Sequence, residues 1–157
     1  MRTFVAGLVL LCVLLGGARA NDAYEDRMSL RTVAACSGIS GGLHQVAVDL
    51  PSPDWSPAEV EEKRKAYQLA SKLLYAYFLE HYETAGLSED QGLRDGTFGI
   101  TLVGDAIRSR PPDMYKKLDR LWAPCLLLAQ AIASKDEASL ALAFALALQQ
   151  IYPRLPS

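Results

Sequence analysis

The stretch Ser56–Gly86 reads SPAEVEEKRKAYQLASKLLYAYFLEHYETAG and carries its own start and stop signals. Ser56 can accept hydrogen bonds from the first-turn N–H groups, and Pro57 suits the first helical position. Glu59 stands three residues after the serine, as in a capping box, and Gly86 supplies a left-handed residue on which helices end. The roughly 29 residues between these signals would form a helix of about 43 Å. We therefore predict a long central helix over about 57–85, with the rest of the chain packed against it.

This stretch has a charged beginning and an apolar, aromatic second half. Near its start, Glu61 and Lys65 form an i,i+4 pair in the favourable orientation. Further along, large apolar or aromatic side chains recur every three to four residues. This spacing predicts a broad buried face, made by Tyr67, Ala70, Leu74, Tyr77, Phe78 and His81.

The segment before this helix allows two readings. Residues 21–35 favour a helix, because acidic residues lead a run of helix-compatible ones. The glycine-rich residues 37–42 form either a break between two short helices or one continuous helix to which another backbone comes close. Residues 43–50 could continue as helix or form a short strand, and Pro51 and Pro53 then make a connector.

Three further helices are predicted after Gly86. A second capping box at 88–91 opens a helix to about Ser109, whose four glycines indicate a close crossing with the central helix. A fourth helix begins at residues 112–113, and Pro124 should kink or break it. A third box at 134–137 opens an Ala/Leu-rich helix over about 135–152. The predicted fold class is all-α, a single-domain bundle of four to five helices.

Residues 1–20, MRTFVAGLVLLCVLLGGARA, have the pattern of a secretory signal peptide. Arg2 makes the start positive, and the apolar run that follows is too short to span a membrane comfortably. Ala18-Arg19-Ala20 has the small-x-small form of a cleavage site. A retained anchor is the alternative. Cleavage before Asn21 leaves residues 21–157, which is an ordinary size for one domain.

The composition of residues 21–157 excludes some partner classes. Without Arg2 and Arg19, 14 basic residues face 18 acidic ones, a formal charge of −4. The charges are scattered along the sequence. There is no basic patch that would indicate nucleic-acid binding. No second long uncharged apolar run follows the leader. We expect no membrane span after cleavage and a periplasmic or secreted location.

Cysteine usage agrees with export. Cys12 leaves with the leader, and Cys36 and Cys125 remain, 89 positions apart. An even pair in an exported chain predicts one disulfide, which would join the first helix to the fourth. The loop-closure relation gives about 4–5 kcal/mol of stabilisation for such a loop. Two buried free thiols are the alternative.

The segment Gly38-Ile39-Ser40-Gly41-Gly42 satisfies the G-x-S-x-G pattern of serine hydrolases. In those enzymes the serine occupies a sharp turn between a strand and a helix. Here a helix-like run precedes Ser40, and the chain is short for such a fold. A catalytic serine is therefore a remote alternative to a close-packed or flexible glycine segment.

No spacing of histidines, cysteines and carboxylates predicts a metal or haem site, and we expect no cofactor. His44 and His81 are the only histidines in the chain. Tyrosines suit interfaces because they join a large ring to a polar tip. The candidate contact residues are Tyr75, Tyr77, His81 and Tyr82, of which Tyr75 is expected to be the most exposed.

The sequence best fits an exported, non-catalytic binding protein with a protein partner in the envelope or outside the cell. An inhibitor or an immunity-type protein that masks an exported toxin is one concrete form. The alternative is a carrier of a small apolar ligand, held between the aromatic face of residues 57–85 and the Leu-rich last helix. An enclosed apolar cavity would favour the carrier, whereas a solid core with one exposed apolar patch would favour the binder.

Overall fold

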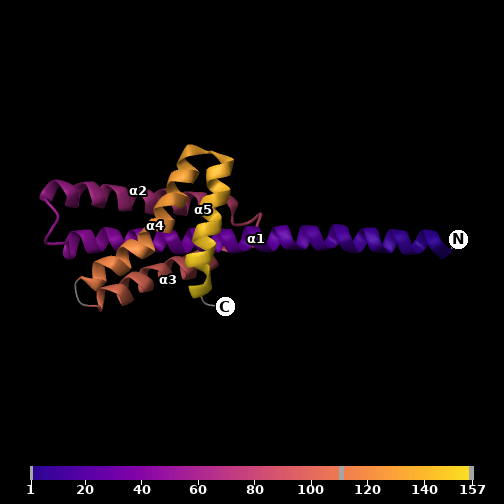
Figure 1. Ribbon diagram of the computed structural model, residues 1–157, viewed down its shortest axis with the longest axis horizontal. Coiled ribbons are helices and arrows are strands. Elements are labelled where there is room, and N and C mark those ends of the chain that lie inside the picture. Colours follow the sequence, from indigo (N-terminus) through magenta and orange to yellow (C-terminus); the bar gives the residue numbers. More distant parts are fainter. Residues whose placement is uncertain (1, 110–111, 156–157) are drawn as a thin grey trace.

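The computed structural model describes the backbone of residues 2–109 and 112–155 and, within these ranges, the side chains from residue 26 onward. The described chain contains helices and no strand. The predicted all-α bundle is therefore confirmed (Figure 1). Its elements are α1 (Arg2–Asp49), α2 (Pro57–His81), α3 (Glu89–Ile107), α4 (Asp113–Ser134), α5 (Glu137–Gln150) and the short 3-10 helix η1 (Tyr152–Arg154).

Helix α2 is the long helix that the capping signals predict. The Ser56 hydroxyl accepts from the Glu59 N–H, and the Glu59 carboxylate accepts from the Ser56 N–H at 2.7 Å. The helix ends at His81, a few residues before the predicted end, and the turn that follows places Gly86 at φ 66°. Four of the six predicted face residues are buried, namely Tyr67, Ala70, Leu74 and Phe78.

The helix at the centre of the bundle is α1. This corrects the prediction that the helix of residues 57–85 is the central one. Residues 32–40 of α1 are all buried, and α1 packs against every other element, including η1. Helix α2 forms one wall and packs against α1 and α4. Figure 1 shows the N-terminal half of α1 projecting away from the bundle. Residues 2–20 of the predicted leader lie there, outside the residues whose side chains are described.

Small side chains explain why α1 occupies the centre. On the α2 side, Ser37 donates to the carbonyl oxygen of Ser71, and Ser71 donates to the carbonyl oxygen of Ser37, both at 3.0 Å. Such a reciprocal pair requires the two backbones to lie close together. Residues 37–49 continue as helix, so the continuous, close-packed reading of the glycine segment is confirmed and the break is not.

The close crossing predicted for the glycines of α3 is made with α1. A Cβ atom added to Gly99 would overlap the carbonyl oxygen of Ala35, and one added to Gly38 would overlap that of Gly96. Only Gly92 meets α2, where an added Cβ would overlap the ring of Phe78. The expected crossing with residues 57–85 is therefore wrong for Gly96 and Gly99. The helix whose backbone comes close to these two glycines is α1.

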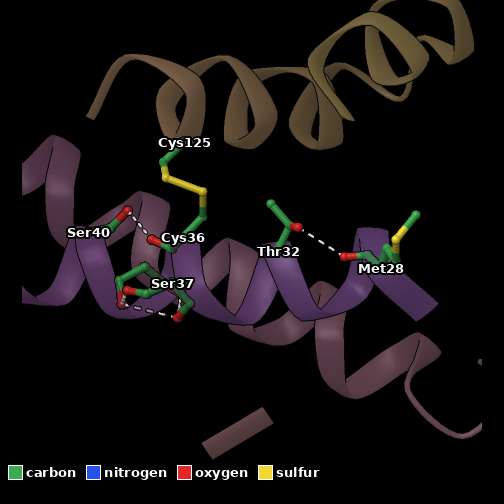
Figure 2. Close-up of a disulfide and its surroundings, with 7 residues drawn as sticks. Met28, Thr32, Cys36, Ser37, Ser40 and Cys125 are labelled. Atoms are coloured by element: carbon green, nitrogen blue, oxygen red, sulfur yellow. Dashed lines mark hydrogen bonds between the residues drawn. A yellow bond between two sulfur atoms is a disulfide. The ribbon is translucent and has the colours of Figure 1, made fainter. Parts of the chain in front are cut away.

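A disulfide joins α1 to α4, as the cysteine count predicts. Cys36 and Cys125 have a Cα–Cα distance of 5.1 Å, and both are fully buried. Figure 2 shows the bond crossing from α1 to the helix packed on it. The bridge therefore ties the central helix to an element 89 residues later in the chain.

Helix α4 begins at Asp113, as predicted, whereas α5 begins later than predicted, at Glu137. Helix α4 runs through Pro124 without a break. Ser134 does not cap α5; its hydroxyl donates to the carbonyl oxygen of Ala131 in α4. Lys135 then adopts φ 56° and ends α4, and Asp136 caps α5 by accepting from the Ser139 N–H at 2.8 Å.

Candidate binding surface

Helix α5 leaves part of its apolar surface in contact with solvent. From Ala138 to Gln150 it contains no charged residue, yet within the helix only Ala143 and Ala147 are buried. Leu142 is 64% exposed. A helix that is apolar all round normally lies inside a larger protein or against a partner. In the single chain, the outer side of this helix therefore remains exposed to solvent.

The order of residues in α5 creates two ridges of large side chains. Large and small residues alternate from Leu140 to Leu148, and at 100° per residue this places Leu140 and Phe144 on one flank. Leu142 and Leu146 fall on the other flank. Exposed alanines fill the space between the two ridges on the outer side. The alternation in the sequence signals a helix that is apolar on every face.

A groove of about 300 Å³ lies between α4 and α5 along the second ridge. Its walls are apolar, and its polar groups are uncharged. Leu127 from α4, which is 45% exposed, faces the groove opposite Leu142. The groove and the adjoining ridge form the surface that we call the α4/α5 face, defined by Leu127, Ala131, Leu142, Ala143 and Leu146.

A second groove, of about 390 Å³, lies between α2 and the C-terminal helices. Leu73, Tyr77 and Leu140 contribute to its apolar walls, and charged residues such as Glu80 and Lys135 contribute to its lining as well. Its position between the aromatic face of α2 and the Leu-rich last helix is the one that the sequence predicts for an apolar ligand.

Tyr77 and His81 are the two predicted contact residues that the structure brings together. Their rings stack with centroids 4.2 Å apart, and His81 Nδ1 lies 2.9 Å from the carbonyl oxygen of Tyr77. Burial, followed by the carboxylates of Asp26 and Glu80, raises the pKa of the Tyr77 phenol. This pair forms a fixed aromatic wall beside α5.

The other two predicted contact residues lie apart from this wall. Tyr82 stacks on Phe78, with centroids 5.5 Å apart, and donates to the carboxylate of Glu83. The Glu83 carboxylate raises the pKa of Tyr82. Tyr75 is half-buried and packs against the core, so it is less exposed than its place in the sequence suggests.

Ser40 does not have the surroundings of a hydrolase nucleophile. Its side chain is fully buried, and its hydroxyl donates to the carbonyl oxygen of Cys36 at 2.8 Å (Figure 2). The residue lies inside a continuous helix, whereas the G-x-S-x-G motif requires a strand-to-helix turn. His44 Nδ1 lies 3.1 Å from the carbonyl oxygen of Arg64. The motif is thus a feature of helix packing.

Asp95 is the one fully buried carboxylate among the described residues, and no local signal in the sequence points to its partner. It accepts from Arg31 Nε at 2.9 Å and Nη2 at 3.0 Å, and from Gln91 Nε2 at 3.1 Å. The hydrogen bond to Asp95 raises the pKa of Arg31. Because both carboxylate oxygens are engaged, this pair links α1 to α3 and leaves no free group for chemistry.

Comparisons with known proteins add no family. The chain matches no protein-family model, no curated protein and no solved structure. Across the residues whose side chains are described, no three His, Cys, Asp or Glu residues are grouped so that they could hold a metal ion. Within the same part of the chain, no helix has the length and apolar character needed to cross a membrane.

Proposed function

We propose that the protein is an exported, non-catalytic helical domain that binds another protein through its α4/α5 face. The observation that carries the proposal is the outer side of α5, where Leu142 and uncharged alanines stay exposed after the core is complete. Contiguous apolar patches on soluble domains mark interaction sites, and the centres of interfaces are depleted in charge. An inhibitor or immunity-type protein would use such a face to cover its target.

Export is the second part of the proposal. It is supported by the leader-like composition of residues 1–20 and by the buried Cys36–Cys125 disulfide, a bond that forms in oxidising compartments. The intact mass of the protein from the native host should correspond to a chain that begins at Asn21 and lacks two thiol hydrogens. A chain that retains residues 1–20, or carries free thiols, would contradict this part.

The binding face can be tested by site-specific photocrosslinking in the native host. A benzoyl-phenylalanine at position 142 should give one discrete protein adduct, since Leu142 lies in the α4/α5 face. Position 69 is the matched control, because Leu69 on α2 is 68% exposed and Leu142 is 64% exposed. The same probe at position 69 should give no such adduct.

The partner identified by crosslinking can then be purified, and its affinity for the protein decides between specific binding and chance capture. We expect Leu142→Lys to weaken binding by at least about tenfold, as loss of a central interface residue does, and Leu69→Lys to change it by less than about twofold. Equal effects of the two substitutions, or equal crosslinking at both positions, would show that the α4/α5 face is not the binding surface.

The groove between α2 and α5 favours a second candidate function, the transport of a small apolar ligand. Its volume of about 390 Å³ falls in the range of ligand sites. The fluorescent probe N-phenyl-1-naphthylamine should then bind with one saturable site, and Leu73→Trp, which fills the groove, should remove that site. Non-saturable binding, or binding unchanged by Leu73→Trp, would exclude this function.

A further inference from the structure

A third cavity, distinct from the two grooves, lies where α1, α2 and α5 meet. Its volume is about 240 Å³. Helix α1 contributes Asp26 and Leu30, α2 contributes Tyr77 and His81, and α5 contributes Phe144. The cavity thus combines a carboxylate with aromatic rings and lies on the opposite flank of α5 from the α4/α5 face.

The aromatic part of this cavity is held in place by packing. Tyr77 stacks on His81, and the Tyr77 and Phe144 ring centroids are 6.3 Å apart with an interplanar angle of 50°. The two rings come from different helices and are inclined to each other. Ring faces in such an arrangement carry negative partial charge and attract a cation placed against them.

The charged part of the cavity has one sign. Among the residues whose side chains are described, Asp26 is its only acidic lining residue, and no lysine or arginine lines it. Arg27, the nearest basic residue in the sequence, is exposed and does not belong to the lining. Burial, followed by the carboxylates of Asp26 and Glu80, raises the pKa of Tyr77.

We propose that this cavity binds an organic cation, an alkylammonium or guanidinium group that packs against the rings of Tyr77 and Phe144 and is neutralised by Asp26. A cation there would gain from the carboxylate and from the two rings, whereas an anion would be repelled by the carboxylate. The volume suits a small head group. The cation can be a free small molecule or the side chain of a lysine or arginine on a bound protein, because both present the same chemistry. This proposal does not depend on the α4/α5 face.

Choline and its neutral isostere 3,3-dimethylbutan-1-ol provide the decisive pair of probes, since they share a shape and differ in charge. Titration followed by the NMR signals of the His81 ring should give saturable binding of choline and at least about tenfold weaker binding of the isostere. Acetyl-lysine amide and acetyl-arginine amide form the second arm. Tighter binding of these two than of choline would identify a basic side chain as the source.

Three variants complete the test. Asp26→Asn and Phe144→Leu should each weaken choline binding by about tenfold. Asp54→Asn, at an exposed acid outside the cavity lining, should leave choline binding unchanged. Thermal melting of each variant shows whether it is folded; Asp26 is exposed, so its amide variant keeps the fold. Binding of the isostere as tight as that of choline, no saturable binding of any cation, or an unaffected Asp26→Asn variant would overturn the proposal.

Discussion

Replacing Asp95 with alanine should destabilise the protein by about 3–5 kcal/mol, because the change leaves the guanidinium of Arg31 without its carboxylate in a largely buried place. Arg31 is only 13% exposed and Asp95 is fully buried. Urea unfolding followed by circular dichroism measures the change in the free energy of unfolding.

Two controls separate the buried pair from an ordinary surface pair. Asp105→Ala breaks an ion pair with Arg108 in which the two side chains are 56% and 80% exposed, and it should cost less than about 1 kcal/mol. The double variant Arg31→Met/Asp95→Leu removes both charges and should recover much of the stability lost in Asp95→Ala. If Asp95→Ala costs no more than Asp105→Ala, the buried pair does not join α1 to α3 as described.

Replacing Gly99 with alanine should destabilise the protein by about 1–3 kcal/mol or more, because the new methyl group would meet backbone atoms. An added Cβ overlaps the carbonyl oxygen of Ala35, and backbone cannot turn aside as a flexible side chain can. The two helices would have to move apart along the crossing. The midpoint of urea denaturation of the variant measures the loss.

Gly104→Ala is the matched control for this substitution. Gly104 belongs to the same helix, but an added Cβ there has no atom within 4 Å. Alanine favours helix over glycine by up to about 1 kcal/mol, so this variant should be slightly more stable than the parent protein. A loss of stability at both positions would mean that the glycines of α3 do not act through the close crossing.

Local signals in the sequence account for the features that were predicted well. The capping box at Ser56 needs only residues within one turn, and the structure forms both of its hydrogen bonds. The disulfide followed from the count of cysteines that remain after the leader. The second capping box is half formed, since Ser88 accepts from the Gln91 N–H while the Gln91 side chain donates to Asp95 instead.

Features that depend on distant residues could not be predicted in the same way. Arg31 and Asp95 are 64 positions apart, and each resembles an ordinary surface charge in the sequence. The glycines of α3 showed that a close crossing exists, but not which helix lies opposite. The exposure of Phe144 and Leu142 could not be predicted for a related reason. The sequence shows that α5 is apolar all round, but only the packed structure shows which side of the helix remains exposed.

Two claims are central here: the bundle is built around α1, and the outer side of α5 is exposed. Residue-resolved amide hydrogen exchange tests both most directly. The slowest-exchanging amides should lie in residues 32–40, which are all buried, and those of residues 138–146 should exchange markedly faster. Equal protection of the two segments in the isolated monomer, or faster exchange in residues 32–40, would contradict the account.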